Sequence, residues 1–302
     1  MRTKVEERAR LLVSVYLPTR NRVDRLIRAV DSVLSQSYEA VELIVVDDAS
    51  TDGTAEFLQR RARADRRLSV ISNTAPRGAP ASRNLGIVRS RGEFVTGLDD
   101  DDEFLRDRVE AFVEGWNRLA ARGIKASCLY AQEVWTRDGG PRRATRKRPV
   151  VAAPDLFEEN YIGNQIFAPR GHLLGAGLFD EKLPAWQDLE FFMRVLQVYG
   201  PAYLVDRVTY SYDATPRIDR ISEQPTRVRR AFELIAEKHG GDDAAQLRAL
   251  FLQIFRSGYK IPPGPADWIR FLSWGGWPCG ATRLLRATIG NRLRRMLAQA
   301  AQ

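Results

Sequence analysis

Four consecutive aspartates, Asp99 to Asp102, follow an apolar segment and are the residues best suited to chemistry. Because like charges this close raise one another's pKa, a cation is expected to balance them. In an extended segment alternate side chains share a face, which predicts Asp99 and Asp101 on one side and Asp100 and Asp102 on the other. An Asp-x-Asp pair offers hard oxygen ligands to Mg²⁺ or Mn²⁺, which take further ligands from water and substrate phosphates. The alternative is a solvated acidic turn that caps the next helix.

Two more polar clusters follow apolar segments nearer the N-terminus. The first is the segment 18–22, with the sequence Pro-Thr-Arg-Asn-Arg, and the second is 47–50, with the sequence Asp-Asp-Ala-Ser. In an open α/β sheet, ligands bind outside the carboxyl ends of the strands. All three clusters are therefore expected to converge at one edge of a sheet.

The elements that must position these clusters follow from hydrophobic periodicity. The fold class is predicted to be α/β, because strands and helices that alternate along the chain form βαβ units with a mainly parallel sheet. Apolar runs predict strands at 11–17, 41–46, 68–72 and 93–98. Apolar residues at helical spacing predict helices at 21–35, 54–63 and 80–91.

Beyond residue 106 the alternation is less regular. We predict three regions: a first subdomain at 1–105, a second at 106–225 and a helical C-terminal extension at 226–302. The elements expected in the second subdomain are a helix at 109–122, a strand at 126–134, a mobile basic loop at 137–149, a helix at 188–199 and a strand at 203–210.

The basic excess of the chain is concentrated at its C-terminal end. The net charge is +9, from 47 basic and 38 acidic residues, and six arginines but no acidic residue follow Asp267. Interleaved with tryptophan, leucine and isoleucine, these arginines predict an amphipathic segment that lies on an anionic membrane surface. A helix packed on its own domain with a solvated basic face is the alternative. Nucleic-acid binding is disfavoured because no recognised nucleic-acid module accompanies the charge.

Composition argues against several classes of protein. Two cysteines, Cys128 and Cys279, cannot form a disulfide framework or a cysteine-rich zinc site, so a reducing compartment is expected. No apolar stretch approaches the roughly 20 residues that span a bilayer, and the run at 11–17 is too short for a secretory signal. The first strand is not followed by Gly-x-Gly-x-x-Gly, which argues against a dinucleotide-dependent oxidoreductase.

Four motifs in register resemble the nucleotide-sugar half of glycosyltransferase family 2. They are Thr19–Arg22, Val45–Asp48 with Ser50, Asp52 and Gly53, Ala81–Gly86, and Leu98–Asp102. The resemblance implies a GT-A fold with a Rossmann-like sheet flanked by helices, and an inverting, metal-dependent transferase that uses Mn²⁺ or Mg²⁺. The sequence does not contain the Gln-x-x-Arg-Trp motif of processive members, which implies that one sugar is added per encounter.

The resemblance also implies roles for individual residues of the donor site. Asp101 would bind the metal, Asp99 would hold the ribose or a metal-bound water, and Asp48 would accept hydrogen bonds from the nucleotide base. Arg83 and Asn84 would meet the ribose or the diphosphate. The full set implied for the donor nucleotide is Pro18, Thr19, Arg20, Asn21, Asp48, Arg83, Asn84, Asp99 and Asp100.

Transfer of a sugar to a hydroxyl requires a base, and a positioned carboxylate is the usual solution. The segment 185–194 resembles the family's Glu-Asp motif, which implies Asp188 as the base and Arg194 as a ligand of the diphosphate. Gln187 stands where the family usually has glutamate, so an auxiliary role of that glutamate is in doubt here. Asp188 could instead cap the helix that follows it.

Three residues are candidates for the acceptor side. Asn164 and Gln165 could hydrogen-bond sugar hydroxyls, or they could belong to a structural turn. Trp186, beside the implied base, could stack on a sugar face or lie buried.

Together the residues and the resemblance indicate a glycosyltransferase that uses a nucleoside-diphosphate sugar, linked to UDP or dTDP. The implied acceptor is a hydroxyl of a bacterial surface glycan or glycolipid, such as lipopolysaccharide, O-antigen or capsule. The implied location is the cytoplasm, at the inner face of the inner membrane. Two alternatives remain open, a nucleotidyltransferase of similar fold and a non-catalytic nucleotide-sugar-binding or membrane-adaptor protein.

Overall fold

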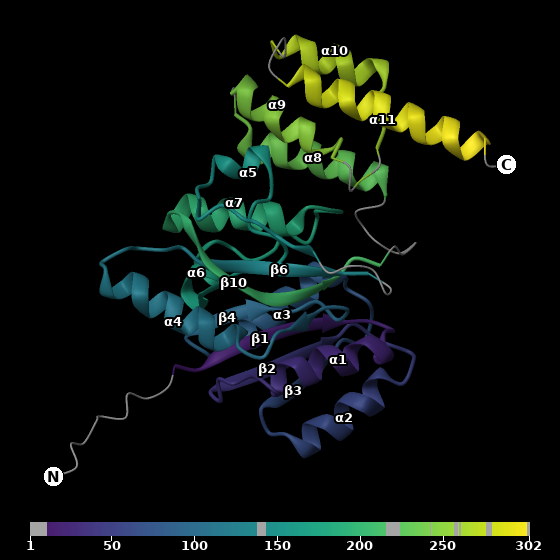
Figure 1. The fold of residues 1–302 in the computed structure, drawn as a ribbon. Coiled ribbons are helices and arrows are strands. Elements are labelled where there is room, and N and C mark those ends of the chain that lie inside the picture. The colour runs from purple at the N-terminus through teal and green to yellow at the C-terminus, as the bar shows by residue number, and fades with distance from the viewer. Residues whose placement is uncertain are drawn as a thin grey trace. The chain divides into compact units, whose positions relative to one another are not determined.

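The computed structural model describes residues 11–137, 143–215, 224–241, 243–256, 259, 261–275 and 280–300, with only the backbone given for 291–300. The chain forms two compact units. The first unit comprises Met1–Ala152, Ile162–Glu181 and Arg194–Thr215, and the second comprises Ala153–Tyr161, Lys182–Met193 and Pro216–Gln302. Each unit is described by itself (Figure 1).

The first unit is built on a mixed sheet, whose strand order is β3-β2-β1-β4-β9-β6-β10-β5 within the described residues. Its N-terminal part is parallel, as the βαβ pattern predicts. The parallel strands are β1 (Val13–Thr19), β2 (Val41–Asp47), β3 (Leu68–Ser72) and β4 (Phe94–Gly97). Each lies within two residues of its predicted position.

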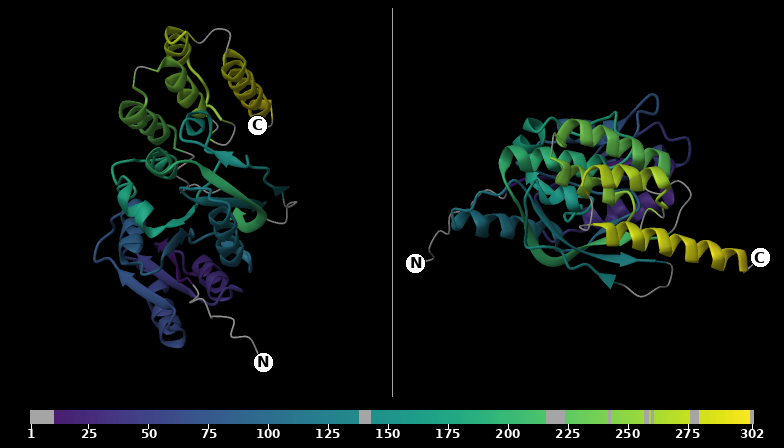
Figure 2. Two further views of the ribbon diagram at one scale, coloured as in Figure 1. Left: turned by 90° about the vertical axis from the view of Figure 1, so that its left-hand side faces the viewer. Right: turned by 90° about the horizontal axis from the view of Figure 1, so that it is seen from above.

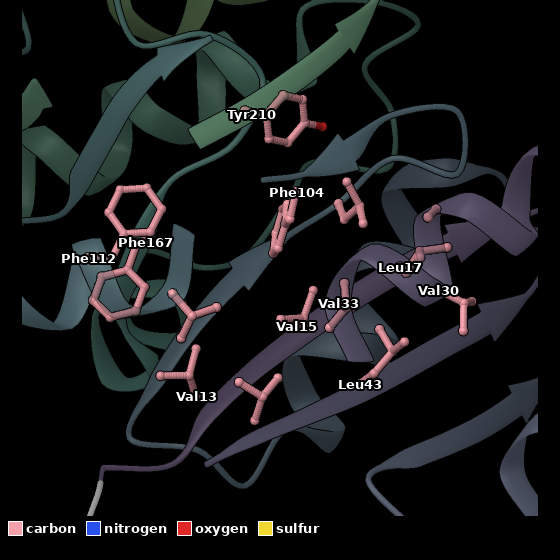
Figure 3. Close-up of a cluster of buried hydrophobic side chains, with 14 of the residues drawn as sticks. Val13, Val15, Leu17, Val30, Val33, Leu43, Phe104, Phe112, Phe167 and Tyr210 are labelled. Carbon is pink, nitrogen blue, oxygen red and sulfur yellow. The ribbon is translucent and has the colours of Figure 1, made fainter. Parts of the chain in front are cut away.

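Helices lie on both faces of this parallel part (Figure 2). Alternate residues of β1, namely Val13, Val15 and Leu17, join a buried apolar cluster with residues of three helices on one face (Figure 3). These helices are α1 (Val23–Leu34), α2 (Thr54–Ala64) and α4 (Arg108–Ala121). On the other face α3 (Ala79–Arg89) contacts β1 and β2 so closely that a Cβ at Gly86 would lie 2.7 Å from the Cβ of Tyr16.

The remainder of the sheet mixes directions, which periodicity did not predict. Strand β9 (Phe167–Pro169) is antiparallel to β4, while β6 (Leu129–Thr136) and β10 (Ala202–Asp213) are parallel to each other. Phe167 stacks between Phe94 and Phe112 with ring centroids 4.8 Å and 5.0 Å away, which joins the two parts of the sheet. The shorter elements are β5 (Glu103–Phe104), β7 (Arg143–Ala144), β8 (Val150–Val151) and α6 (Arg170–Gly175).

The segment 137–149 is anchored where the structure describes it, which corrects the prediction of a mobile loop for that part. It contains β7, which pairs with β6. The ammonium group of Lys147 lies 3.0 Å from the Glu133 carboxylate and donates to the carbonyl of Ile162 at 2.7 Å. Residues 138–142 lie outside the described part.

The second unit is helical, as predicted for the chain after Thr226. It contains α5 (Asp155–Glu158), α8 (Pro225–His239), α9 (Ala244–Gln253), α10 (Pro265–Ser273) and α11 (Ala281–Ala300). The helix α7 (Gln187–Tyr199) begins in the second unit and ends in the first.

The apolar residues of the C-terminal extension are divided between the core and the surface. Phe271 and Leu284 are fully buried, and the ring of Trp274 lies 5.5 Å from the ring of Phe251. Ile269 and Leu285 are exposed. Among the described residues, the structure contains no helix long and apolar enough to cross a membrane.

Candidate active site

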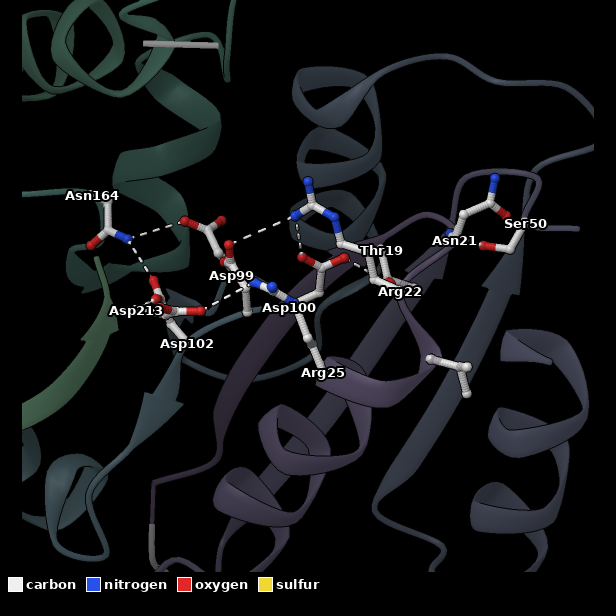
Figure 4. A network of polar contacts seen from close by, with 12 residues as sticks. Thr19, Asn21, Arg22, Arg25, Ser50, Asp99, Asp100, Asp102, Asn164 and Asp213 are labelled. Carbon is white, nitrogen blue, oxygen red and sulfur yellow. Dashed lines mark hydrogen bonds and ion pairs between the residues drawn. The ribbon is translucent and has the colours of Figure 1, made fainter. Parts of the chain in front are cut away.

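The four aspartates form a turn at the carboxyl end of β4 (Figure 4). Because β4 ends at Gly97, the four residues do not form the extended segment from which alternating faces were predicted. The predicted pairs nevertheless recur in burial, with Asp100 and Asp102 buried and Asp99 and Asp101 partly accessible. The amide of Asp102 donates to the carbonyl of Asp99 at 3.1 Å, which closes the turn. Asn164 donates to the carboxylates of both Asp99 and Asp102, at 3.1 Å and 3.2 Å, so these two lie on the same side.

Two of the carboxylates, those of Asp100 and Asp102, are buried in the fold. Asp100 accepts hydrogen bonds from Thr19 at 2.9 Å and from Arg22 at 3.0 Å, and burial raises its pKa to about 6. Asp102 accepts from the Tyr210 hydroxyl at 2.7 Å and from the amide of Asp213 at 2.8 Å. Burial, followed by the charges of its neighbouring aspartates, raises the pKa of Asp102 well above its ordinary value. These two residues therefore hold the turn together.

The other two carboxylates, those of Asp99 and Asp101, remain partly accessible, with side chains 21% and 15% exposed. Arg83 pairs with Asp99 at 2.9 Å, and Arg22 lies 3.7 Å from Asp101. Carboxylate oxygens are ligands that Mg²⁺ and Mn²⁺ accept. Within the described residues no three His, Cys, Asp or Glu side chains converge on a metal position. An ion held here would therefore need further ligands from water or from substrate phosphates.

The loops after β1 and β2 are joined to each other beside this turn. Asn21 has a φ of +53°, and its side-chain oxygen accepts a hydrogen bond from the amide of Thr51 at 2.7 Å. Pro18 and Thr19 are buried, whereas Arg20 is exposed at the rim. The predicted convergence of the first two clusters is thus observed within the first unit.

Asp48 organises the loop that precedes α3. Its carboxylate accepts hydrogen bonds at 2.8 Å from the side chain of Asn73 and from the amides of Arg77 and Gly78. Burial acts to raise the pKa of Asp48, but these hydrogen bonds lower it below its ordinary value. Asp48 is therefore a stable anion next to Arg20, whose charge also lowers its pKa.

Arg83 and Asn84 lie within α3 and have different surroundings. Arg83 reaches Asp99, and its guanidinium lies 5.5 Å from the centroid of the Phe179 ring. The side-chain N–H of Asn84 donates to the carbonyl of Phe179 at 2.9 Å, and its side-chain oxygen accepts from the amide of Phe179 at 2.8 Å. Arg83 thus faces the aspartate turn, whereas Asn84 fixes the segment that contains Phe179.

The two acceptor candidates of the first unit make hydrogen bonds to other residues of the fold. Besides both aspartates, Asn164 donates to the Tyr210 hydroxyl at 3.3 Å. Gln165 is 4% exposed, and its oxygen accepts from the Tyr16 hydroxyl at 3.2 Å. These contacts within the protein agree with the alternative that Asn164 and Gln165 have a structural role.

Asp188 lies at the start of α7 in the second unit. Its carboxylate accepts a hydrogen bond from the Asn160 amide at 3.0 Å. Trp186 is 7% exposed, has a φ of +57° and donates its indole N–H to the Tyr259 hydroxyl at 2.8 Å. Gln187, which replaces the usual glutamate, donates to the carbonyl of Leu183 at 3.0 Å.

Arg194, six residues further along α7, belongs to the first unit. Its guanidinium donates to the carbonyls of Ala176 and Leu178. Leu178 has a φ of +63°, which is uncommon for a non-glycine residue. In the structure Arg194 therefore stabilises a strained turn.

Sequence reasoning missed two residues beside the aspartate turn, Tyr210 and Asp213. Both lie in β10, and Asp213 pairs with Arg25 of α1 at 3.1 Å. The signal that could have found them is their position near the carboxyl end of a strand, the rule that identified the other clusters.

Comparison with known proteins decides the family. Residues 14–174 match the family described as Glycosyl transferase family 2. The chain belongs to glycosyltransferase family 2. The chain is similar to the putative colanic acid biosynthesis glycosyl transferase WcaA of Escherichia coli, 35% identical over 66% of this chain and 71% of that protein. A GalNAc(5)-diNAcBac-PP-undecaprenol beta-1,3-glucosyltransferase of Campylobacter jejuni is 34% identical over 56% of this chain and 55% of that protein.

Solved structures confirm the fold. TarS 1–349 of S. aureus superposes with a TM-score of 0.65 and 19% identity, covering 97% of this chain and 92% of that one. The mannosyltransferase PcManGT of Pyrobaculum calidifontis, in complex with GDP-Man and Mn²⁺, gives a TM-score of 0.57 and 19% identity, with coverage of 97% and 80%. The predicted α/β class and GT-A fold are thus confirmed, and the chain is a glycosyltransferase.

Proposed function

We propose that this family 2 glycosyltransferase moves one sugar at a time, with inversion, from a nucleoside-diphosphate sugar to a hydroxyl of a bacterial cell-surface glycan. The observation that carries the proposal is the division of the aspartate turn. Asp100 and Asp102 are buried in the fold, whereas Asp99 and Asp101 are partly accessible between two arginines. The names of the WcaA and Campylobacter relatives support a surface-glycan acceptor.

Asp101, with Asp99 beside it, would hold Mn²⁺ or Mg²⁺ in the proposed enzyme. When bound, the ion would neutralise charge that develops on the departing diphosphate. Arg83, 2.9 Å from Asp99, is placed to exchange this partner for a phosphate oxygen, because guanidinium groups bind carboxylate and phosphate alike. The PcManGT complex contains Mn²⁺ and a nucleotide sugar, which supports this assignment.

The nucleotide would occupy the loops at the carboxyl ends of β1 and β2. Asp48 is the proposed acceptor for the N–H groups of the nucleotide base. The residues proposed to surround the same base are Pro18, Thr19, Arg20 and Asn21. Those proposed to face the ribose and the diphosphate are Arg83, Asn84, Asp99 and Asp100. A UDP-linked or dTDP-linked donor is the expected class. A nucleotide-sugar-binding subdomain at 1–105 and an acceptor-binding subdomain at 106–225 follow from the same proposal.

Asp188 is the proposed general base, which takes the proton of the acceptor hydroxyl while that oxygen attacks the anomeric carbon. A single displacement of this kind inverts the configuration of the sugar. Asn164, Gln165 and Trp186 stay the proposed acceptor residues, although their observed contacts favour support of the site. Arg194 stays a proposed ligand of the diphosphate.

The C-terminal extension is proposed to attach the enzyme to the anionic inner face of the bacterial inner membrane. Ile269 and Leu272 of α10 are 70% and 46% exposed, and Leu285 and Ile289 of α11 are 49% and 48% exposed. Their spacings of three and four residues place each pair on one helix face. The acid-free sequence after Asp267 supports an anionic partner. Attachment there would bring the enzyme to glycolipid acceptors.

A thermal-shift screen tests the proposed function. UDP, dTDP and GDP and their sugar conjugates are each added with Mn²⁺ and, separately, with EDTA. A ligand at 100 times its Kd should stabilise the protein by about 2.7 kcal/mol, and we expect this with at least one of these nucleotides only when Mn²⁺ is present. Stabilisation by none of them would contradict the proposal.

A further inference from the structure

Two other segments of the second unit support the predicted base Asp188, one by direct contact and one through Trp186. One segment contributes Asn160, whose amide N–H donates to the Asp188 carboxylate at 3.0 Å. The other contributes Tyr259, which follows α9 and lies in the region after Thr226 that the motifs of the family do not cover. Both segments belong to the same compact unit as Asp188.

Tyr259 acts on Asp188 through Trp186. The indole N–H of Trp186 donates to the Tyr259 hydroxyl at 2.8 Å, and the two ring centroids lie 5.9 Å apart. Trp186 has a φ of +57°, a conformation that is a genuine outlier for a bulky residue and needs support from its surroundings. The carbonyl of Trp186 accepts a hydrogen bond at 3.0 Å from the amide of Glu190, which lies in the first turn of α7. Trp186 therefore sets where α7 begins, and with it the position of Asp188.

The two supporting segments are tied to each other. Gln253 of α9 donates to the carbonyls of Leu156 and Phe157 in α5, both at 2.8 Å. Arg256 pairs with Glu159, the residue before Asn160. Because the amide of Tyr259 donates to the carbonyl of Arg256 at 3.0 Å, the segments of Asn160 and Tyr259 are linked by hydrogen bonds and an ion pair.

The charges near Asp188 are consistent with this arrangement. Burial, and after it the negative charge of Asp188, raise the pKa of Tyr259 to about 12, so the phenol stays neutral. Arg256 and Glu159 also act on Tyr259, and they are paired with each other. Glu190, two residues beyond Asp188, is buried. Its carboxylate lies 3.4 Å from the ammonium group of Lys238 and 3.1 Å from Nε2 of His239, both in α8.

We propose that Asn160 and Tyr259 are positioning residues for the Asp188 carboxylate, so that the C-terminal extension helps to place the proposed base in addition to any membrane role. The inference rests on the proposed function of Asp188 as the base. A general base must lie within hydrogen-bond reach of the proton it removes, and a displacement of about 1 Å can cost about 100-fold in rate. Asn160 fixes the carboxylate directly, and Tyr259 fixes the helix start that carries it.

The test measures release of nucleoside diphosphate from UDP-glucose, UDP-N-acetylglucosamine, GDP-mannose and dTDP-rhamnose, with Mn²⁺ and with water as the acceptor. Asn160→Asp places a like charge 3.0 Å from the base and should move the acidic limb of the pH–rate profile up by about one pH unit. Tyr259→Phe should lower kcat about tenfold and leave the KM for the donor within about twofold.

Tyr199→Phe is the matched control. It removes a tyrosine hydroxyl from the far end of the same helix, where the contact with the carbonyl of Gly171 is 3.5 Å long, and it should leave kcat unchanged. If Asp188→Asn stays active, or if no donor is hydrolysed, the proposed function fails. If Asp188→Asn is inactive, but Asn160→Asp leaves the acidic limb of the pH–rate profile in place and Tyr259→Phe keeps its kcat, this inference alone is overturned. A lower Tm without a change in kcat in Tyr259→Phe would also overturn it.

Discussion

The arginines beside the aspartate turn are the residues through which the site can respond to a diphosphate. Arg83 lies 2.9 Å from Asp99 and is only 16% exposed, so its orientation is well defined before any donor binds. Arg22 lies between Asp100 and Asp101, at 3.0 Å and 3.7 Å. The turn therefore carries cations that neutralise part of its charge in the absence of substrate.

Arg83→Gln is expected to weaken donor binding while the fold persists. A hydrogen bond to a charged group contributes about 1.5 to 3 kcal/mol, so the Kd for the nucleotide should rise at least about tenfold. Titration calorimetry with UDP and Mn²⁺, or with the nucleotide that the thermal-shift screen selects, measures this. An unchanged Kd would remove Arg83 from the donor site.

Arg194→Gln separates the two roles of Arg194. Its guanidinium donates to the carbonyls of Ala176 and Leu178. Loss of these charge-assisted bonds should lower the free energy of unfolding by about 2 kcal/mol. Urea denaturation measures the stability, and donor kinetics in the same variant measure the diphosphate role. A large rise in the KM for the donor with unchanged stability would favour the diphosphate role over the structural one.

At this scale the sequence predicted which residues gather at the site better than how they are oriented. The position of Asp99 to Asp102 after a buried strand located the turn. The predicted pairs recur in burial, but the extended geometry behind that prediction does not. Strand β4 ends at Gly97, and Asn164, which is 62 residues away from Asp102, donates to both Asp99 and Asp102. Local periodicity contains no information on such a contact.

Among the elements, the parallel strands are secured by a buried carboxylate on β2. Glu42 accepts hydrogen bonds from Ser14 of β1 at 2.6 Å and from the amide of Arg91 at 2.7 Å. Burial acts to raise the pKa of Glu42, but these hydrogen bonds and the Arg91 charge lower it below 4.5. Glu42 therefore links β1 to the chain that enters β4.

Glu42→Gln should lower the free energy of unfolding by about 1 to 3 kcal/mol at pH 7, because the buried donors lose their charged acceptor. Since the pKa in the folded state is lowered, this contribution is present above pH 4.5 and is lost as the pH falls through the folded value. Denaturant titrations between pH 3 and pH 7 should thus show the two proteins converge at low pH. Asp31→Asn, at a side chain 53% exposed in its pair with Arg61, is the control and should change little. A constant difference across this pH range would contradict the role of the charge.

The elements that sequence predicted well are those with a strong period. Strands β1, β2 and β4 are buried along their whole length, and helices α1, α2 and α4 each bury an apolar face. Strands β5, β7, β8 and β9 have only two or three residues, too few to show a period, and they introduce the antiparallel pairings. The extension of β10 to Asp213 was missed because its last residues are polar.

At the scale of the whole molecule, each compact unit is assembled from separated stretches of chain. The second unit combines residues around Asn160, the start of α7 and the C-terminal helices. Sequence patterns predicted boundaries at 105 and 225, because the strand-helix alternation becomes irregular after the first and the chain is helical after the second, and those boundaries stay a prediction about function. That Asp188 shares a unit with α8 and α9 depends on tertiary packing, which periodicity does not report.

Membrane attachment is testable through the exposed apolar side chains of α10 and α11. Ile269→Asp, at a residue 70% exposed, should reduce sedimentation with vesicles of 30% phosphatidylglycerol in phosphatidylcholine several-fold at low salt. Val198→Asp, at a residue 60% exposed on α7, is the matched control and should bind as the wild type does. Added salt should weaken binding, because salt screens the attraction between exposed arginines and anionic headgroups. Equal sedimentation of both variants, or of wild type with neutral vesicles, would contradict attachment through this surface.

The most direct test of a metal-dependent site at the aspartate turn measures release of nucleoside diphosphate from a panel of nucleotide sugars by wild type and by Asp101→Asn, with Mn²⁺ and with EDTA. We expect wild type to release the diphosphate of at least one donor with Mn²⁺ and to stop with EDTA. We expect Asp101→Asn to be at least about 100-fold slower at an unchanged Tm, because it loses the proposed metal ligand. Full activity of Asp101→Asn, or wild-type activity that EDTA does not affect, would contradict a metal-dependent transferase centred on the aspartate turn.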